Sequence, residues 1–442
     1  MPDPTLRDPL RRPLFRRLAA TYAVNELGDW MGIVALSVLV FDRTGSAYAT
    51  AALYLGTRFL PAVVAPPLVA RIERPPPRFV LPILYCGEAA AFGALALLVD
   101  HFSLAAIVAV AAFDGALALA ARAITRAVVA RALEPSGELR AGNAILNVAF
   151  TVGAAVGPGI AGLIVAGFGV QTALLLDAIS FYLIACILLS TRSMPELEPE
   201  AGRFRERLRA GLDYIRQIPA LRQLLVAQSG ALVFFAAVLP IEVIYVKDVL
   251  GAGDSGYGLL LASWGAGMVL GSIVFASVRR RPLPRLLFFS TLTVAAGYLG
   301  LAAAPSLALA CTASVLGGTG NGVQWVSAVS AVQELSRQSM QARVVSVLES
   351  LAAAMPGVGF VLGGLVASVA EPRATFLVAG VGIIGIVAIA SATLKGQWES
   401  VATDAEAPTE VEDPIVLELI PAGRTFDAGA EVPGQSKREV RP

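Results

Sequence analysis

Residues 142–166 read GNAILNVAFTVGAAVGPGIAGLIVA and carry no charged side chain. An α-helix needs about 20 predominantly apolar residues to cross a hydrocarbon core of about 30 Å. Only helices and closed barrels satisfy every backbone polar group in lipid, and an apolar run of this length favours a helix. The stretch therefore predicts a transmembrane helix in an integral membrane protein.

The composition of the whole chain extends this prediction. Its 442 residues are 56% hydrophobic and 15% charged, whereas soluble domains carry about 25% charged residues. We expect an all-α membrane protein with twelve transmembrane helices. Their approximate positions are 18–41, 47–70, 79–99, 103–123, 142–166, 171–191, 222–246, 256–278, 286–304, 306–331, 344–369 and 373–394.

Basic residues alternate between the two sides of these predicted helices. One set of connections contains only Arg43, Lys247 and Arg373, and nearly all other basic residues lie in the opposite set. Under the positive-inside rule, the arginine-rich side and both termini are cytoplasmic. We expect a multi-pass protein of the bacterial inner, or plasma, membrane.

The longest internal connection divides the predicted helices into six and six. It contains RFRERLRAGLDYIRQIP, whose apolar residues fall on one helical face, so we expect an amphipathic helix at the cytoplasmic interface. The acidic, Pro-containing C-terminal segment predicts a disordered cytoplasmic tail. The expected parts are an N-terminal segment 1–17, a bundle 18–191, a linker 192–221, a bundle 222–394 and a tail 395–442.

Short motifs recur between the two halves. RPPPR at 74–78 corresponds to RPLPR at 281–285, and Asp-x-x-Gly occurs at both 42–45 and 248–251. The offset of roughly 200 residues is too long for a solenoid repeat. It predicts a duplicated six-helix bundle, and parallel repeats of this kind occur in the major facilitator architecture.

Several classes of function are disfavoured by what the sequence lacks. The three Cys residues are isolated in apolar runs, there is one His, and no phosphate-binding GxxxxGK[ST] loop occurs. We therefore expect no catalysis, no metal and no cofactor. The net charge of +1 and the dispersed basic clusters also argue against nucleic-acid binding.

Ionisable residues within the predicted helices are candidates for proton coupling, because each costs at least ~2.5 kcal/mol in a membrane and normally faces a bundle interior. Asp29 and Arg58 fall near mid-depth in the first two spans, and Glu26 lies one turn from Asp29. We expect these three to form a buried acid pair balanced by one base; the alternative is static pairing between helices. Glu88 and Asp114 are further candidates, with a neutral, hydrogen-bonded carboxyl as the alternative. Asp177 falls nearer the outer ends, where an interfacial role is expected.

Uncharged polar residues suggest where a ligand binds. The candidate substrate residues are Asn143, Asn147, Asn321, Gln324 and Trp325. Amide groups beside an aromatic wall suit an amphiphilic ligand, although interhelical hydrogen bonds are an equal alternative.

Four stretches give the chain a family resemblance. They are NELGDWMGIVALSVLVFDRTGSA at 25–47, the fifth span with its flanks at 138–169, the amphipathic linker, and YVKDVLGAGDSGYGLLLASWGAGMVLGS at 245–272. Together they resemble the major facilitator superfamily, specifically its bacterial branch of enterobactin exporters and macrolide-efflux proteins. The resemblance implies two pseudo-symmetric six-helix bundles that work by alternating access. It also assigns conformational switching to the fifth-span set Gly153, Gly157, Pro158, Gly159 and Gly162, with Gly359 and Gly364 as their second-half counterparts; packing alone is the alternative.

Two positions depart from the family pattern. The family's G-x-L-A-D-R-x-x-R-R turn after the second span is here PLVARIERPPPR, where Glu73, Arg74 and Arg78 are the expected cytoplasmic gate. The arginine that many drug antiporters carry in the fourth span has no counterpart in AVAAFDGALAL.

The resemblance favours a monomeric, proton-coupled exporter of an amphiphilic small molecule such as a drug, siderophore or secondary metabolite. An uptake permease for a small solute and a non-transporting receptor or scaffold are the alternatives. Its expected partners are the substrate, protons and the lipid bilayer.

Overall fold

The computed structural model describes residues 7–65, 75–191, 193–197, 204–278, 281–338 and 340–393, which contain helices and no strands. Nine of the described helices are long and apolar enough to cross a membrane. Three further observations bring the count to the expected twelve. The helical segment 47–65 and α12 (Leu307–Glu334) each add one, and the third is a break in α6 (Leu139–Leu189) at Gly169, where φ is 83° and ψ is 164°.

Six of these twelve helices form the first bundle, the two parts of α6 counted separately. α1 packs along α6, α4 packs between α5 and α6, and α2 continues through a π-helical turn, η2, beside α5. Their bounds are η1 Pro9–Arg11, α1 Pro13–Thr44, α2 Ala47–Tyr54, η2 Leu55–Phe59, α4 Pro77–Leu97, α5 Leu104–Leu133, η3 Glu134–Ser136 and α6 Leu139–Leu189.

The second bundle follows the short helix α7. α12 packs between α10 and α11, α14 packs between α11 and α8, and α13 packs on α8. The bounds are α7 Phe204–Gln217, α8 Pro219–Val238, α9 Glu242–Ile244, η4 Tyr245–Val249, α10 Asp254–Val278, α11 Leu283–Ala303, α12 Leu307–Glu334, α13 Gln341–Val369 and α14 Pro372–Thr393.

The duplicated motifs have the same backbone conformation in both bundles. Pro76 caps the start of α4 and Pro282 caps the start of α11, both with φ −56° and ψ 131°. Gly45 and Gly251 close the two Asp-x-x-Gly turns with φ values of 57° and 62°, a region that favours glycine because it lacks a Cβ atom. The repeat in the sequence is therefore a repeat in the structure.

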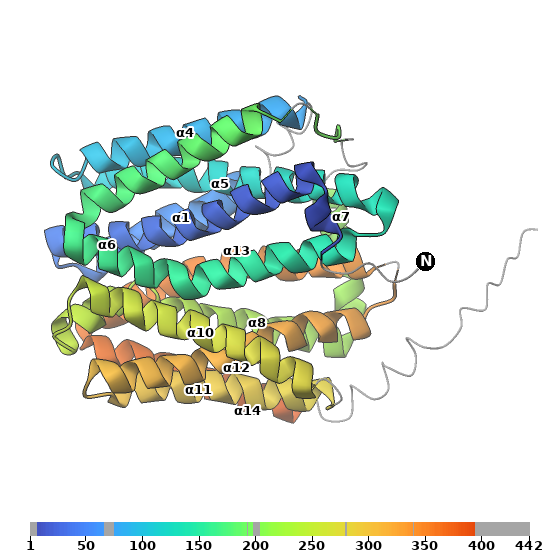
Figure 1. Cartoon of the computed structure of the whole chain (residues 1–442). Helices are drawn as coiled ribbons and strands as arrows, with labels where there is room; N and C mark the ends of the chain where they lie inside the picture. The colour runs from blue at the N-terminus through green and yellow to red at the C-terminus, as the bar shows by residue number, and fades with distance from the viewer. Residues whose placement is uncertain are drawn as a thin grey trace, which may run out of the picture. The chain divides into compact units, whose positions relative to one another are not determined.

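The two bundles lie side by side (Figure 1), and their most extensive contacts are between α6 and α10 and between α2 and α13. The first pair approaches closely at small residues. A methyl group on Gly162 would lie 2.8 Å from the Gly258 Cα atom, so neither glycine tolerates a side chain without moving a helix. Backbones that approach this closely are typical of membrane helix interfaces.

Large apolar side chains cover the outside of both bundles. Phe168 is 75% exposed and Val369 is 79% exposed, as expected where lipid replaces water as the solvent. The interior of the bundles is also apolar, with fully buried aromatic residues such as Tyr22 and Phe376.

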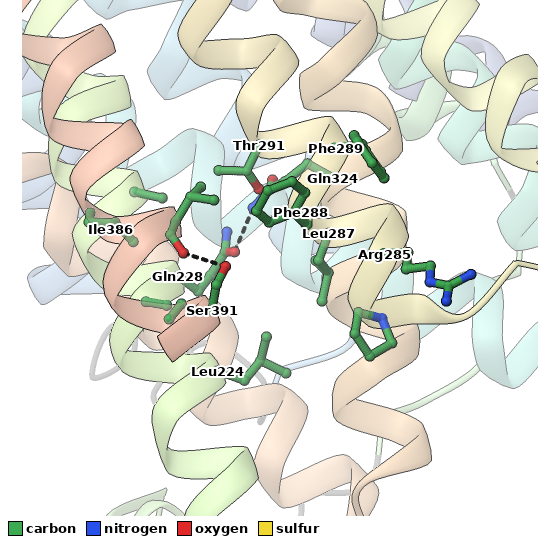
Figure 2. A pocket seen from close by; sticks show the side chains of 15 residues that line it. Leu224, Gln228, Arg285, Leu287, Phe288, Phe289, Thr291, Gln324, Ile386 and Ser391 are labelled. Carbon is green, nitrogen blue, oxygen red and sulfur yellow. Dashed lines mark hydrogen bonds between the residues drawn. The ribbon is translucent and has the colours of Figure 1, made fainter. Parts of the chain in front are cut away.

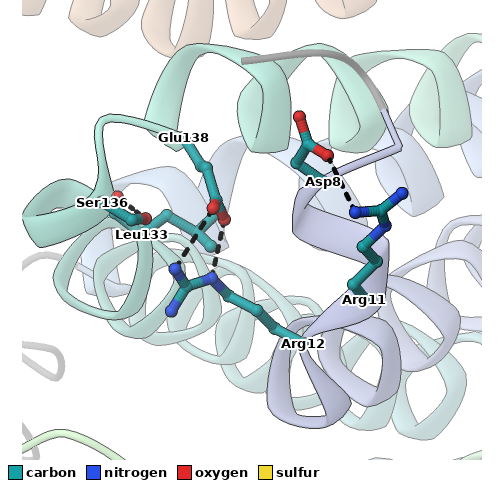
Figure 3. A network of polar contacts seen from close by, with 6 residues as sticks. All are labelled: Asp8, Arg11, Arg12, Leu133, Ser136 and Glu138. Atoms are coloured by element: carbon teal, nitrogen blue, oxygen red, sulfur yellow. Dashed lines mark hydrogen bonds and ion pairs between the residues drawn. The ribbon is translucent and has the colours of Figure 1, made fainter. Parts of the chain in front are cut away.

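Polar contacts tie the helix ends at the arginine-rich side. Arg12, just before α1, donates from Nε and Nη2 to both carboxylate oxygens of Glu138, just before α6, at 2.7 and 3.2 Å (Figure 3). α7 packs on α13 with Ile215 buried, and the Tyr214 hydroxyl accepts a hydrogen bond from the Arg337 backbone N–H. The linker sequence therefore does form a helix, and part of its apolar face covers the second bundle.

Candidate functional site

Two carboxylates on α1 share one arginine on α5. Arg122 Nη2 donates to Asp29 Oδ2 at 2.7 Å, and Arg122 Nε lies 3.1 Å from Glu26 Oε1. Glu26 and Asp29 are three residues apart, so they lie on the same helical face and both reach this guanidinium. The predicted pairing of two acids with one base is present, but the base is Arg122 and not the expected Arg58.

Arg122 is not singled out by the sequence because α5 is longer than its hydropathy suggests. A fourth span that ends near residue 123 places Arg122 at the membrane surface. The helix instead continues to Leu133, so Arg122 lies well inside it and turns into the bundle. The stretch AVAAFDGALAL contains no arginine, as the sequence analysis states, but Arg122 follows it by three residues in the same helix.

Arg58 lies nearby in the π-helical turn η2. Its guanidinium is 5.8 Å from the centre of the Trp30 ring, within the range of a cation–π contact. A cavity of about 90 Å³ is lined by Asp29, Arg58, Asp114 and Arg122 together. Single π-turns within α-helices are frequent at functional sites.

Three more carboxyl groups lie in the same bundle: Glu88 and Asp177 are buried, and Asp114 is half-buried. Glu88 is fully buried, and neither of its carboxyl oxygens has a hydrogen-bond partner among the described residues. Within the same part of the chain, Asp114 Oδ1 and Asp177 Oδ2 are also buried without a hydrogen bond. An ionised carboxylate in such surroundings is costly, whereas a neutral carboxylic acid needs no countercharge.

The sequence predicts that Asp177 lies at the membrane–water interface. The structure contradicts this prediction, because the residue is only 1% exposed. Its side chain fits against α1 because Gly28 and Gly32 lack side chains there, and a methyl group on Gly28 would overlap the Asp177 carboxyl. Ser180 Oγ lies 3.3 Å from Asp177 Oδ1 and donates to it. A pair of glycines facing an acid on another helix cannot be recognised from hydropathy alone.

The predicted switching residues fall into two groups. Gly159 and Gly162 of α6 face α10 across the bundle contact, where Pro158 also presents its carbonyl, and Gly364 of α13 faces Ala51 of α2. The others pack inside their own bundles: Gly153 and Gly157 against α1, and Gly359 against α8.

The predicted substrate residues are not all brought together. Gln324 is buried and donates from Nε2 to Gln228 Oε1 on α8 at 2.6 Å, so the interhelical alternative holds for this residue. Asn321 is half-buried and Trp325 is 36% exposed on the same helix. Asn143 and Asn147 are exposed on α6.

The predicted cytoplasmic gate is described only in part. Glu73 and Arg74 lie outside the described residues. Arg78, in the first turn of α4, places its guanidinium 4.6 Å from the centre of the Phe79 ring.

Three polar contacts join the bundles at the end opposite the arginine-rich connections. Lys247 Nζ lies 2.5 Å from Asp42 on α1 and 2.6 Å from Asp254 on α10, so one ammonium links the two bundles. The Ser368 hydroxyl of α13 bonds to the Tyr48 hydroxyl of α2 at 2.6 Å. Nearby, the hydroxyls of Tyr54 and Tyr257 are 3.4 Å apart.

A family comparison accounts for this arrangement. The sequence profile of a family described as "Transmembrane secretion effector" matches residues 5–423. The chain belongs to this family, a branch of the major facilitator superfamily. The predicted fold, twelve helices in two related bundles, is confirmed.

Several relatives of this chain are named transporters. "Multidrug efflux pump Tap" of Mycobacterium tuberculosis is 29% identical over 425 residues, covering 88% of this chain and 96% of the relative. The Tap protein of Mycolicibacterium fortuitum is 27% identical over 408 residues, covering 87% and 96%. "Uncharacterized MFS-type transporter YfiS" of Bacillus subtilis is 24% identical over 316 residues, covering 67% and 73%.

Solved structures resemble this chain in fold alone. A mutant of the peptide transporter POT in complex with sulfate gives a TM-score of 0.72 at 13% identity, covering 88% of this chain and 95% of that one. The nucleoside transporter NupG gives 0.70 at 13% identity, covering 87% and 100%. Sequences this different share the architecture without indicating a shared substrate.

Proposed function

We propose that this protein exports an amphiphilic small molecule by alternating access, driven by protons. The observation that carries the proposal is the shared pairing of Arg122 with Asp29 and Glu26 inside the first bundle. The full-length similarity to proteins named multidrug efflux pumps supports small-molecule export. The fold family supports a transporter and not an enzyme.

The coupling chemistry follows from one base serving two acids. When both carboxylates are ionised, the group carries a net charge of −1, and one added proton makes it neutral. Protonation of Asp29 would remove its attraction for Arg122, and the guanidinium would then pair with Glu26 alone. A proton thereby changes the relative free energies of two helix arrangements, which is how a bound ligand shifts a conformational equilibrium.

Orientation follows from the charge asymmetry of the connections. With the arginine-rich ends in the cytoplasm, the contacts of Lys247 with Asp42 and Asp254 lie at the external side. We infer that the described conformation is held closed at that side. Export would then require the Lys247–Asp42 pair, which joins the two bundles, to separate once in each cycle.

Transport by inverted membrane vesicles tests this proposal. The substrate is first chosen by a susceptibility screen that compares a deletion strain with an overexpressing strain. The lumen of an inverted vesicle corresponds to the cell exterior, so we expect an acidic lumen to drive substrate accumulation as protons leave. Accumulation that is indifferent to the gradient, or substrate loss from acidic vesicles, contradicts proton-coupled export.

The role of the charged group is tested in the same vesicles with Asp29→Asn. We expect this variant to abolish gradient-driven accumulation while it folds normally, since asparagine is nearly the same size and does not titrate. Asp213→Asn is the matched control, because Asp213 lies on α7 and pairs with nearby Arg216 at 2.9 Å. Full activity of Asp29→Asn would remove Asp29 from the mechanism.

A further inference from the structure

A cavity of about 290 Å³ lies inside the second bundle, apart from the charged group. It is bounded by α8, α11, α12 and α14 (Figure 2). α11 and α14 form the flank of this bundle that faces away from the first bundle (Figure 1). Phe289, which lines the cavity from α11, is 64% exposed on the surface. The cavity therefore opens toward the membrane rather than toward the contact between the bundles.

The polar part of this cavity is a pair of buried glutamines. Gln228 is 5% exposed and Gln324 is 6% exposed, and their mutual hydrogen bond uses the Gln324 Nε2 group and the Gln228 Oε1 atom. The second half of each amide, Nε2 of Gln228 and Oε1 of Gln324, has no hydrogen-bond partner among the described residues. The pair thus presents one free donor and one free acceptor beside a mainly apolar wall.

No charged group among the described residues faces this pair. Arg285 is the only charged residue among those lining the described cavity, and its side chain extends away from the glutamines in Figure 2. The Ser391 hydroxyl already donates to the Val387 carbonyl at 2.7 Å. The cavity therefore suits an uncharged ligand that supplies both an acceptor and a donor.

We propose that this cavity binds an uncharged amphiphile in which a hydrogen-bond donor and acceptor lie close together, as in a secondary amide, and admits it from the membrane. Its volume is near the lower end of the range of about 300–1,000 Å³ for small-molecule sites, and an apolar pocket with a few convergent polar groups is the usual form of such a site. The entry role rests on the proposed export function. The binding itself requires no gradient and is tested separately.

Photolabelling of the full chain in phospholipid nanodiscs tests the binding. The probe is N-methylpalmitamide carrying a diazirine on its alkyl chain, and labelled peptides are mapped by mass spectrometry. We expect labelling concentrated on the α8, α11 and α14 segments that line the cavity, despite the large excess of bilayer lipid. Labels spread evenly over all lipid-facing helices would overturn the proposal.

Filling the cavity provides a first variant. Ala231 lines it from α8, and Ala231→Phe should lower labelling of these segments at least five-fold. The matched control is Ala276→Phe, since Ala276 is exposed on α10 away from the cavity and should leave labelling unchanged. Equal labelling of both variants contradicts binding within the cavity.

The glutamine pair provides a second test, which remains informative even if Ala231→Phe does not fold. Gln228→Leu and Gln324→Leu are combined, because replacing one partner alone would leave a buried amide unpaired. We expect wild type to favour the amide probe at least five-fold over the same diazirine alkane without the amide. The double variant should keep labelling by the alkane and lose this preference; an unchanged preference overturns the assigned role of the glutamines. If the glutamine test fails while Asp29→Asn still abolishes transport in vesicles, the entry site is ruled out and the proposal of proton-coupled export is unaffected.

Discussion

At the scale of single residues, Arg122 is the centre of the charged group. Its side chain is shared by Glu26 on one side and Asp29 on the other. Removing one partner of a buried ion pair costs more than the pair itself contributes, because the remaining charge is left without compensation. The stability effect of changing Arg122 should therefore depend on whether its acids are still present.

A double-mutant cycle measures this dependence. We expect Arg122→Met to destabilise the wild type by more than it destabilises a Glu26→Gln, Asp29→Asn background, with a difference of about 1–3 kcal/mol. The measurement is thermal or denaturant unfolding of the purified variants in one detergent. Equal losses in both backgrounds would mean that Arg122 contributes through packing and not through charge.

Asp177 illustrates a second effect at the same scale. Its carboxyl fits against α1 only because Gly28 has no side chain. We expect Gly28→Ala to destabilise the protein by about 1–3 kcal/mol, the usual cost of overpacking a tight interior. Gly93→Ala is the control in unfolding measurements, because no atom lies within 4 Å of a methyl group placed there. A loss of stability as small as that of the control would show that α1 can move to accommodate the added methyl group at little cost in free energy.

At the scale of helices, the contact between α6 and α10 depends on close backbone approach. Gly258 faces the Pro158 carbonyl and the Gly162 backbone without room for a methyl group. We expect Gly258→Leu to force these helices apart and to weaken the described arrangement. Disulfide cross-linking between cysteines placed at Gly159 and Ala262, whose Cβ positions are 3.4 Å apart, should then slow several-fold; an unchanged rate would mean that the helices tolerate the larger residue.

Of the two ion pairs of Lys247, the one with Asp42 acts between the bundles. A pair near the protein surface is worth about 0.2–1 kcal/mol, so Lys247→Ala should shift the equilibrium away from the described state by a few-fold. Spin-label distances between α1 and α10 would show this as a larger population of separated bundles at that end. The control is Arg43→Ala, which removes a nearby cation that bonds to the Val99 carbonyl at 2.8 Å. A distance distribution identical to that of wild type would show that Lys247 does not help to hold the bundles closed at that end.

At the scale of the whole molecule, membrane orientation decides which side of the membrane each end of the bundles faces. The positive-inside rule predicts that the connection containing Ala252 faces the exterior and that the connection containing Ser136 faces the cytoplasm. In intact cells, a membrane-impermeant maleimide should label Ala252→Cys and should label Ser136→Cys only after permeabilisation. The opposite pattern would reverse the proposed orientation.

What the sequence determines by itself is the architecture. Long apolar runs such as 142–166 have to be helical in lipid, and the alternation of arginine-rich connections predicts an even number of them. The duplicated motifs at 74–78 and 281–285 predict two related bundles. These are local or periodic signals, so no knowledge of which helices touch is required to interpret them.

Only the tertiary structure decides which polar groups meet. Arg122 pairs with Asp29 although 93 residues separate them, and Gln228 pairs with Gln324 across 96 residues. Hydropathy gives the approximate depth of a side chain, but the rotation of each helix about its axis decides what that side chain faces. That rotation is set by packing between helices, where glycines such as Gly28 and Gly258 allow close contact. The charged group and the membrane-facing cavity are therefore properties of the assembled bundles.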